Sequence, residues 1–113
     1  MIDIKKDLEE TGLMVRKQGS VPANMPDSYI TFWGDPSTDN LNVDNKTASV
    51  DYPFTVIYYT KDWENLYSRF EEIISLLKSK DYVMDGMGFD IASGLDEYSA
   101  RCIEVTKIEK IGG

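Results

Sequence analysis

Histidine is absent from the 113 residues, and cysteine occurs once, at Cys102. Ser-His-Asp triads, Cys-His dyads and zinc sites that contain histidine are therefore excluded. A single cysteine cannot form an internal disulfide or a zinc cage of thiolates. We expect Cys102 to be a small buried hydrophobe.

Long apolar runs are also missing, because none approaches the roughly 18 residues that a membrane-spanning helix needs. The N-terminal segment MIDIKKDLEE alternates charged residues with isoleucine, whereas a signal peptide needs an unbroken apolar stretch. We therefore expect an intracellular product without membrane contact.

The composition that is present, with 42% hydrophobic and 28% charged residues, is typical of a globular protein. The length predicts one domain, residues 1–113, with a single core. Acidic residues outnumber basic ones by 20 to 12, and the net charge of -8 disfavours a nucleic-acid reader. The same charge suits the lining of a pore through which DNA slides without sticking.

Hydrophobic periodicity predicts a short N-terminal helix, one long amphipathic helix and several strands. The long helix covers 62–79, with a core stripe that includes Trp63 and Tyr67 and with Asp62 as its cap. Along the last strand, Ile103 and Val105 share one face whereas Ile108 falls on the other, which predicts a bulge near Thr106. The other predicted elements are a helix at 2–11 and strands at 13–18, 29–33, 47–60, 81–84 and 97–111.

Strand 47–60 is apolar on both faces, with Ile57 and Tyr59 on the face opposite Val56 and Tyr58. A sheet with one solvated side would place polar residues there, so this second face is expected to meet a helix or another subunit. Residues 34–46 form a long polar excursion that contains Asp35, Asp39 and Asp44.

Two close glycines in YVMDGMGFDIASG, residues 82–94, raise the question of a phosphate or metal loop. The stretch lacks the third glycine of a dinucleotide fingerprint, the lysine of a P-loop and the oxygen ligands of a calcium loop. We interpret it as a bend or bulge that lets Met84, Met87, Phe89 and Ile91 pack. Asp44-Asn45-Lys46 matches a fragment of magnesium nucleases, but a solvated turn is the favoured reading.

The order of elements, with DYPFTVIYYTKD running into WENLYSRFEEIISLLKS and the closing segment that contains MDGMGFD, resembles prophage tail-terminator or tail-completion proteins of long-tailed phages. The resemblance spans nearly the whole chain. It implies an α+β fold, a mixed and mostly antiparallel sheet with an N-terminal helix and one long amphipathic helix packed against it. It also implies a non-enzymatic protein without a cofactor that forms a ring, typically of six subunits, at the end of the tail tube.

The same resemblance implies that the ring halts tube growth, joins the head connector and lets DNA pass without specific binding. Assembly would take place in the bacterial cytoplasm and end in the virion tail. The predicted partner contacts are Asp35, Asp39, Asp44, Ile57 and Tyr59. Three alternatives stay open: an acidic DNA mimic that inhibits a host enzyme, another prophage minor structural protein, and a metal-dependent phosphodiesterase that uses Asp44.

Overall fold

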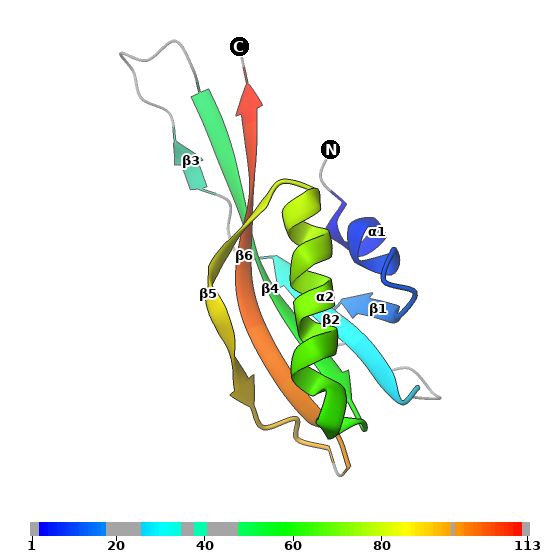
Figure 1. Cartoon of the computed structure of the whole chain (residues 1–113). Coiled ribbons are helices and arrows are strands. Elements are labelled where there is room, and N and C mark those ends of the chain that lie inside the picture. Colours follow the sequence, from blue (N-terminus) through cyan, green and yellow to red (C-terminus); the bar gives the residue numbers. More distant parts are fainter. Residues whose placement is uncertain (1–2, 18–25, 35–37, 41–47, 96, 112–113) are drawn as a thin grey trace.

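The chain forms an α+β fold, as predicted, in a computed structural model that describes residues 3–17, 26–34, 38–40, 48–95 and 97–111. Figure 1 shows two helices lying against one sheet. The elements are α1 (Ile4–Glu9), β1 (Met14–Lys17), β2 (Ser28–Gly34), β3 (Thr38–Asn40), β4 (Ala48–Thr60), a 3-10 turn η1 (Trp63–Asn65), α2 (Leu66–Ser79), β5 (Tyr82–Ile91) and β6 (Ser99–Ile111).

The six-stranded sheet is mixed and mostly antiparallel, in the order β1-β2-β4-β6-β5, with β3 paired to β4 beyond the end of β2. Only the β1–β2 pair is parallel among the described strands. Strands β4 and β6 pair without interruption from Ala48–Ile111 to Thr60–Ser99 and run past the end of α2 (Figure 1). The molecule therefore measures 52 × 26 × 23 Å, and β1 and β5 form the edges of its sheet.

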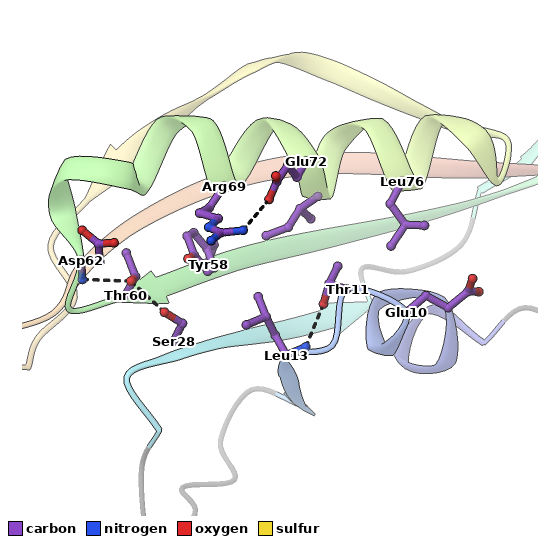
Figure 2. A pocket seen from close by; sticks show the side chains of 11 residues that line it. Glu10, Thr11, Leu13, Ser28, Tyr58, Thr60, Asp62, Arg69, Glu72 and Leu76 are labelled. Atoms are coloured by element: carbon purple, nitrogen blue, oxygen red, sulfur yellow. Dashed lines mark hydrogen bonds and ion pairs between the residues drawn. The ribbon is translucent and has the colours of Figure 1, made fainter.

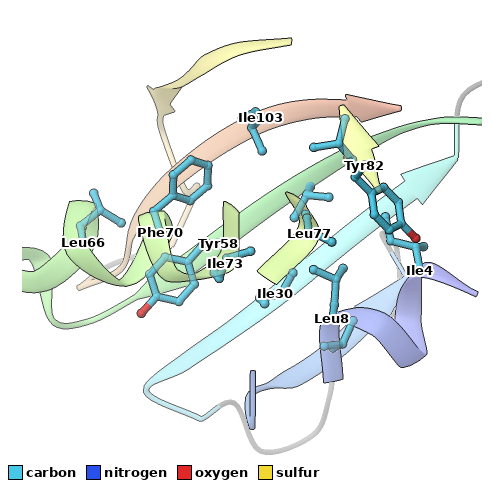
Figure 3. Close-up of a cluster of buried hydrophobic side chains, with 13 residues drawn as sticks. Ile4, Leu8, Ile30, Tyr58, Leu66, Phe70, Ile73, Leu77, Tyr82 and Ile103 are labelled. Carbon is cyan, nitrogen blue, oxygen red and sulfur yellow. The ribbon is translucent and has the colours of Figure 1, made fainter. Parts of the chain in front are cut away.

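Both helices cover the same face of the sheet, which we call the helix face (Figures 1 and 3). The α2 stripe recurs every three or four residues, so one side of that helix is continuously apolar. Helix α1 is tied to the start of β5 by the Tyr82 hydroxyl, which donates to Asp7 at 2.8 Å. The main core consists of Ile4, Leu8, Val15, Ile30, Val56, Tyr58, Leu66, Phe70, Ile73, Leu77, Tyr82, Ile103 and Val105.

Three predictions about the long helix are wrong in detail. Trp63 and Tyr67 are 68% and 53% exposed, not core residues. Trp63 precedes α2 in the η1 turn, whose tighter winding takes its side chain out of phase with the stripe. The Asp62 side chain makes no capping bond and instead accepts from the Asn65 side-chain amide at 2.8 Å.

Strand β6 contains no bulge at Thr106, because its register with β4 is constant along the whole strand. Ile108 lies on the opposite side of the sheet from Ile103 and Val105 simply because strand side chains alternate. It is 43% exposed there. The predicted bulge is therefore wrong, because Ile108 is an exposed residue of a regular strand and no extra residue precedes it.

Pro53 lies in the middle of β4, opposite Thr106 of β6. On the other side of β4, the ladder with β2 ends at the Gly34–Phe54 pair and the ladder with β3 begins at the Thr38–Asp51 pair. The proline, which has no N–H to donate, therefore falls between two ladders, where its cost to the sheet is small.

The opposite, helix-free face holds a second buried cluster of Tyr29, Ile57, Tyr59, Ala100 and Cys102. The rings of Tyr29 and Tyr59 stack at 4.7 Å, and Tyr98 meets Tyr29 edge-on at 5.7 Å. The tyrosine side chains cover this part of the sheet, since both helices lie on the other face. The prediction that Cys102 is buried is confirmed.

Candidate protein-docking surface

The predicted partner contacts fall in different environments. Asp35 and Asp44 lie outside the described residues, and Asp39 belongs to β3, where it pairs with Val50 of β4. Ile57 and Tyr59 are only 4% and 8% exposed on the helix-free face. Little of either side chain is left for a partner to cover, and a role for these residues in docking stays a prediction.

The glycines of the 82–94 stretch form a bulge in edge strand β5. Its ladder with β6 runs to the Asp85–Glu104 pair and resumes at the Phe89–Cys102 pair, so residues 86–88 lie opposite a single residue of β6. Gly86 and Gly88 have φ values of +79° and +84°, a region that favours glycine. The predicted bulge is confirmed.

Gly88 also lets the bulge lie close to the core. A Cβ atom at this position would be 2.8 Å from the Cys102 carbonyl oxygen and 2.9 Å from Phe70 Cε2. A Cβ at Gly86 would meet nothing within 4 Å. The chain therefore needs glycine at 88 for both conformation and space, and at 86 for conformation alone.

Arg101 of β6 fastens the bulge from the side of α2. Its Nη2 donates to the carbonyl oxygens of Met87 and Gly88 at 3.1 and 3.2 Å, and its Nη1 donates to Asp90 Oδ1 at 2.8 Å. The guanidinium lies 4.9 Å from the Tyr67 ring centre and 5.4 Å from that of Phe70. Five donors in a planar fork suit arginine to this position better than lysine.

Tyr67 completes the network, because its hydroxyl donates to Asp90 Oδ2 at 2.6 Å. This hydrogen bond and the one from Arg101 lower the pKa of Asp90, because both stabilise the carboxylate. The bond to Asp90 likewise raises the pKa of Tyr67. The charged carboxylate, the phenol and the guanidinium therefore hold β5 and α2 in one arrangement.

The side chains that this network presents outward are apolar. Met87 is 80% exposed and Phe89 55%, so the prediction that these two residues pack is wrong. Met84 and Ile91 do pack, each half-buried against one of the two clusters. The bulge turns residues 86–88 away from the regular alternation, and this carries Met87 out of the core.

We define the β5 surface as the exposed side chains Trp63, Tyr67, Val83, Met87 and Phe89. Two grooves border its residues Trp63, Tyr67 and Met87 and share Tyr67 as a common wall. The larger, of about 470 Å³, lies between α2 and β5, and the smaller, of about 360 Å³, reaches from Trp63 to the end of β5. Exposed aromatic and methionine side chains beside grooves are typical of protein-docking sites.

Acidic groups accompany the β5 surface on the helix-free face. Asp85 and Glu104 are directly opposite each other on neighbouring strands, and both are exposed. Within the described part of the chain, neither forms an ion pair with a lysine or arginine. Like charges in directly opposed positions destabilise a sheet.

A third groove, of about 460 Å³, lies on the helix face between α2 and the turn after α1 (Figure 2). Its polar groups are bonded to one another: Ser28 shares a hydrogen bond with Thr60 at 2.8 Å, and Arg69 pairs with Glu72 at 3.2 Å. Glu10 at its rim pairs with Lys80. Leu13, Ile73 and Leu76 supply the apolar part of the lining.

Metal-binding geometry is not found among the residues that the structure describes, since no three His, Cys, Asp or Glu side chains gather there. Asp90 bonds to Arg101 and Tyr67, and Asp44 lies outside the described ranges. The suggestion of a nuclease-like site at Asp44 stays a prediction.

A scan against protein-family models finds no match to the chain, and a search of curated proteins finds no relative. In the described ranges, no helix has the length and apolar character to cross a membrane.

Proposed function

We propose that this chain is a structural protein of a phage or prophage tail, similar to a tail terminator, that assembles into a ring at the end of the tail tube. The ring stops tube growth and joins the head connector. The observation that carries the proposal is the β5 surface, which gathers exposed Trp63, Tyr67, Met87 and Phe89 at one edge of the sheet.

The chemistry of that surface favours docking. Aromatic and methionine side chains supply much of the energy of protein interfaces when they enter well-packed sites. Here Arg101, Asp90 and Gly88 hold the bulge that carries Met87 and Phe89. Because the strand is fixed before a partner arrives, binding costs less conformational entropy.

The charge supports the same proposal. With 20 acidic and 12 basic residues, a ring of such chains would repel a DNA backbone from its wall and let DNA slide through. The order of elements, which resembles that of tail-terminator proteins, supplies the specific role. Tail-tube and head-connector proteins are accordingly the proposed partners.

Size-exclusion chromatography with light scattering, followed by negative-stain electron microscopy, tests the proposal. We expect a particle several times the 12.9 kDa mass of one chain, and a closed ring with a central channel. A Met87→Asp/Phe89→Asp variant should shift the particle to monomers, since two buried carboxylates would oppose the contact. Leu95→Asp, at a 41% exposed residue in the loop after β5, is the matched control.

A chain that stays monomeric at the highest attainable concentration, and that competes with DNA for a nucleic-acid enzyme, would contradict the ring and favour the DNA-mimic alternative. Magnesium-dependent cleavage of nucleic acid, lost in Asp44→Ala, would instead favour the phosphodiesterase. Neither outcome is expected from the β5 surface.

A further inference from the structure

The two edges of the sheet carry opposite charge on the same face. On β5, Tyr82 and Met84 pack in the main core, so Val83 and Asp85 point to the helix-free face. On β1, Val15 packs in the main core, so exposed Arg16 points to that same face. The carboxylate of Asp85 thus lies at one edge, with Glu104 opposite it on the neighbouring strand β6, and a cation lies at the other edge.

The lengths and directions of the two edge strands also match. The regular part of β5 before the bulge, residues 82–85, pairs through four residues, and β1 is four residues long. Strand β1 is parallel to β2, and each later step across the sheet reverses direction, so β1 and β5 run antiparallel. A second copy in the same orientation would place its β1 antiparallel to β5.

We propose that the β5 edge of one copy adds to the β1 edge of the next, so that the sheet continues from subunit to subunit. This inference rests on the proposed ring and specifies which strands of neighbouring subunits pair in it. In the register that pairs Val83 with Arg16 of the second copy, Met84 meets Val15 on the helix face. Asp85 is then diagonal to Arg16, within reach of its long side chain.

Charge decides against the alternative in which β5 pairs with β5 of a second copy about a two-fold axis. That arrangement would bring Asp85 and Glu104 of both copies together, adding like charges to a pair that already repels. The β1 edge brings Arg16 instead. A head-to-tail contact of this kind is heterologous, so it propagates and closes into a ring when the rotation permits.

Disulfide trapping tests the contact directly. In a Cys102→Ala background, Arg16→Cys and Val83→Cys combined in one chain would face each other across the interface, at a distance that a disulfide spans. On oxidation at high concentration we expect a ladder of covalent multimers on a denaturing gel. The matched control, Lys6→Cys with Val83→Cys, places the first cysteine on an exposed position of α1, on the helix face and so across the sheet from Val83, and should stay monomeric.

Reversing the charges of Arg16 and Asp85 is a second test of the contact. Arg16→Glu and Asp85→Lys should each lower the assembled fraction about tenfold at a fixed concentration, because like charges then meet across the contact. The chain that carries both changes should recover to within about twofold of the original, since the pair is reversed. Lys6→Glu and Glu64→Lys, which change the charge equally elsewhere, should leave assembly unchanged.

The outcomes separate this contact from the ring. Rings without a ladder, or rings that tolerate both single charge changes, would overturn the contact and leave the proposed function standing. A ladder from open-ended chains that never close would uphold the contact and contradict the ring. A chain that gives neither ladder nor assembly, or only two-fold dimers, overturns the contact.

Discussion

The two faces of the sheet are built from the same strands but are covered differently. On the helix face, α1 and α2 bury the central residues Val56, Ile103 and Val105 almost completely. On the helix-free face, tyrosines bury Ile57 and Cys102, whereas Val83, Phe89 and Ile108 stay exposed toward β5. Apolar strand residues are thus buried only where a helix or an aromatic side chain of the same chain covers them. The apolar residues that stay exposed are available for a partner.

Phenylalanine truncation on each face should give the largest contrast. Phe70→Ala removes a fully buried ring from α2, beside Gly88 and Arg101, and is expected to lower the free energy of unfolding by about 3–5 kcal/mol. Phe89→Ala removes an exposed ring and should change it by less than about 0.5 kcal/mol. Urea denaturation of the two variants measures both values, and equal losses would contradict the assignment of Phe89 to a docking surface.

Substitution of the two bulge glycines should give a smaller contrast within β5 itself. Gly88→Ala combines a left-handed backbone with overlap against Cys102 and Phe70, and is expected to cost about 2–4 kcal/mol. A Cβ at position 86 meets no atom within 4 Å, so Gly86→Ala should lower the free energy of unfolding only through its left-handed backbone, by about 1–2 kcal/mol. If denaturation gave the same cost for both, the close approach of the bulge to the core would be disproved.

The Asp90 network should produce the smallest effect, visible in its pH dependence. Because the folded-state pKa of Asp90 is lowered, its contribution to stability is present above the usual aspartate pKa of 3.8 and is lost as pH falls through the folded value. Asp90→Asn should therefore lower the thermal midpoint at pH 7, with the difference shrinking toward about pH 2. Tyr67→Phe, which removes one of the two hydrogen bonds, should lower the midpoint by less.

A difference between Asp90→Asn and the original chain that persists unchanged at low pH would show that the carboxylate charge is not what fastens the bulge. Thermal unfolding followed by circular dichroism at a series of pH values distinguishes the two results.

Local patterns were sufficient for most of the fold. The apolar residues of 47–60 and 97–111, and the three-and-four spacing within 62–79, predicted the two long strands and the long helix. The paired glycines predicted the β5 bulge, since positive φ is a property that the residue type itself indicates. Sequence patterns failed at Trp63, Tyr67, Met87 and Phe89, which were predicted to pack but are more than half exposed.

The candidate surface was harder to predict than the fold. The sequence directed attention to Ile57 and Tyr59, because an apolar second face suggests a partner, but tyrosines of the same chain cover these residues. Arg101, which fastens the bulge, carried no signal in the sequence, because its partners Tyr67, Met87 and Asp90 are brought to it only by the pairing of β5 with β6 and the packing of α2.

The sequence by itself determined which segments become helix and strand, where glycine permits a bulge, and that the chain is strongly acidic, since propensity, φ freedom and charge are properties of residues and their spacing. Only the tertiary structure decided which apolar side chains are covered, and that Asp85 meets Glu104 while Arg16 lies at the far edge of the same face. Those relations depend on strand order and register, which bring together residues distant in the chain.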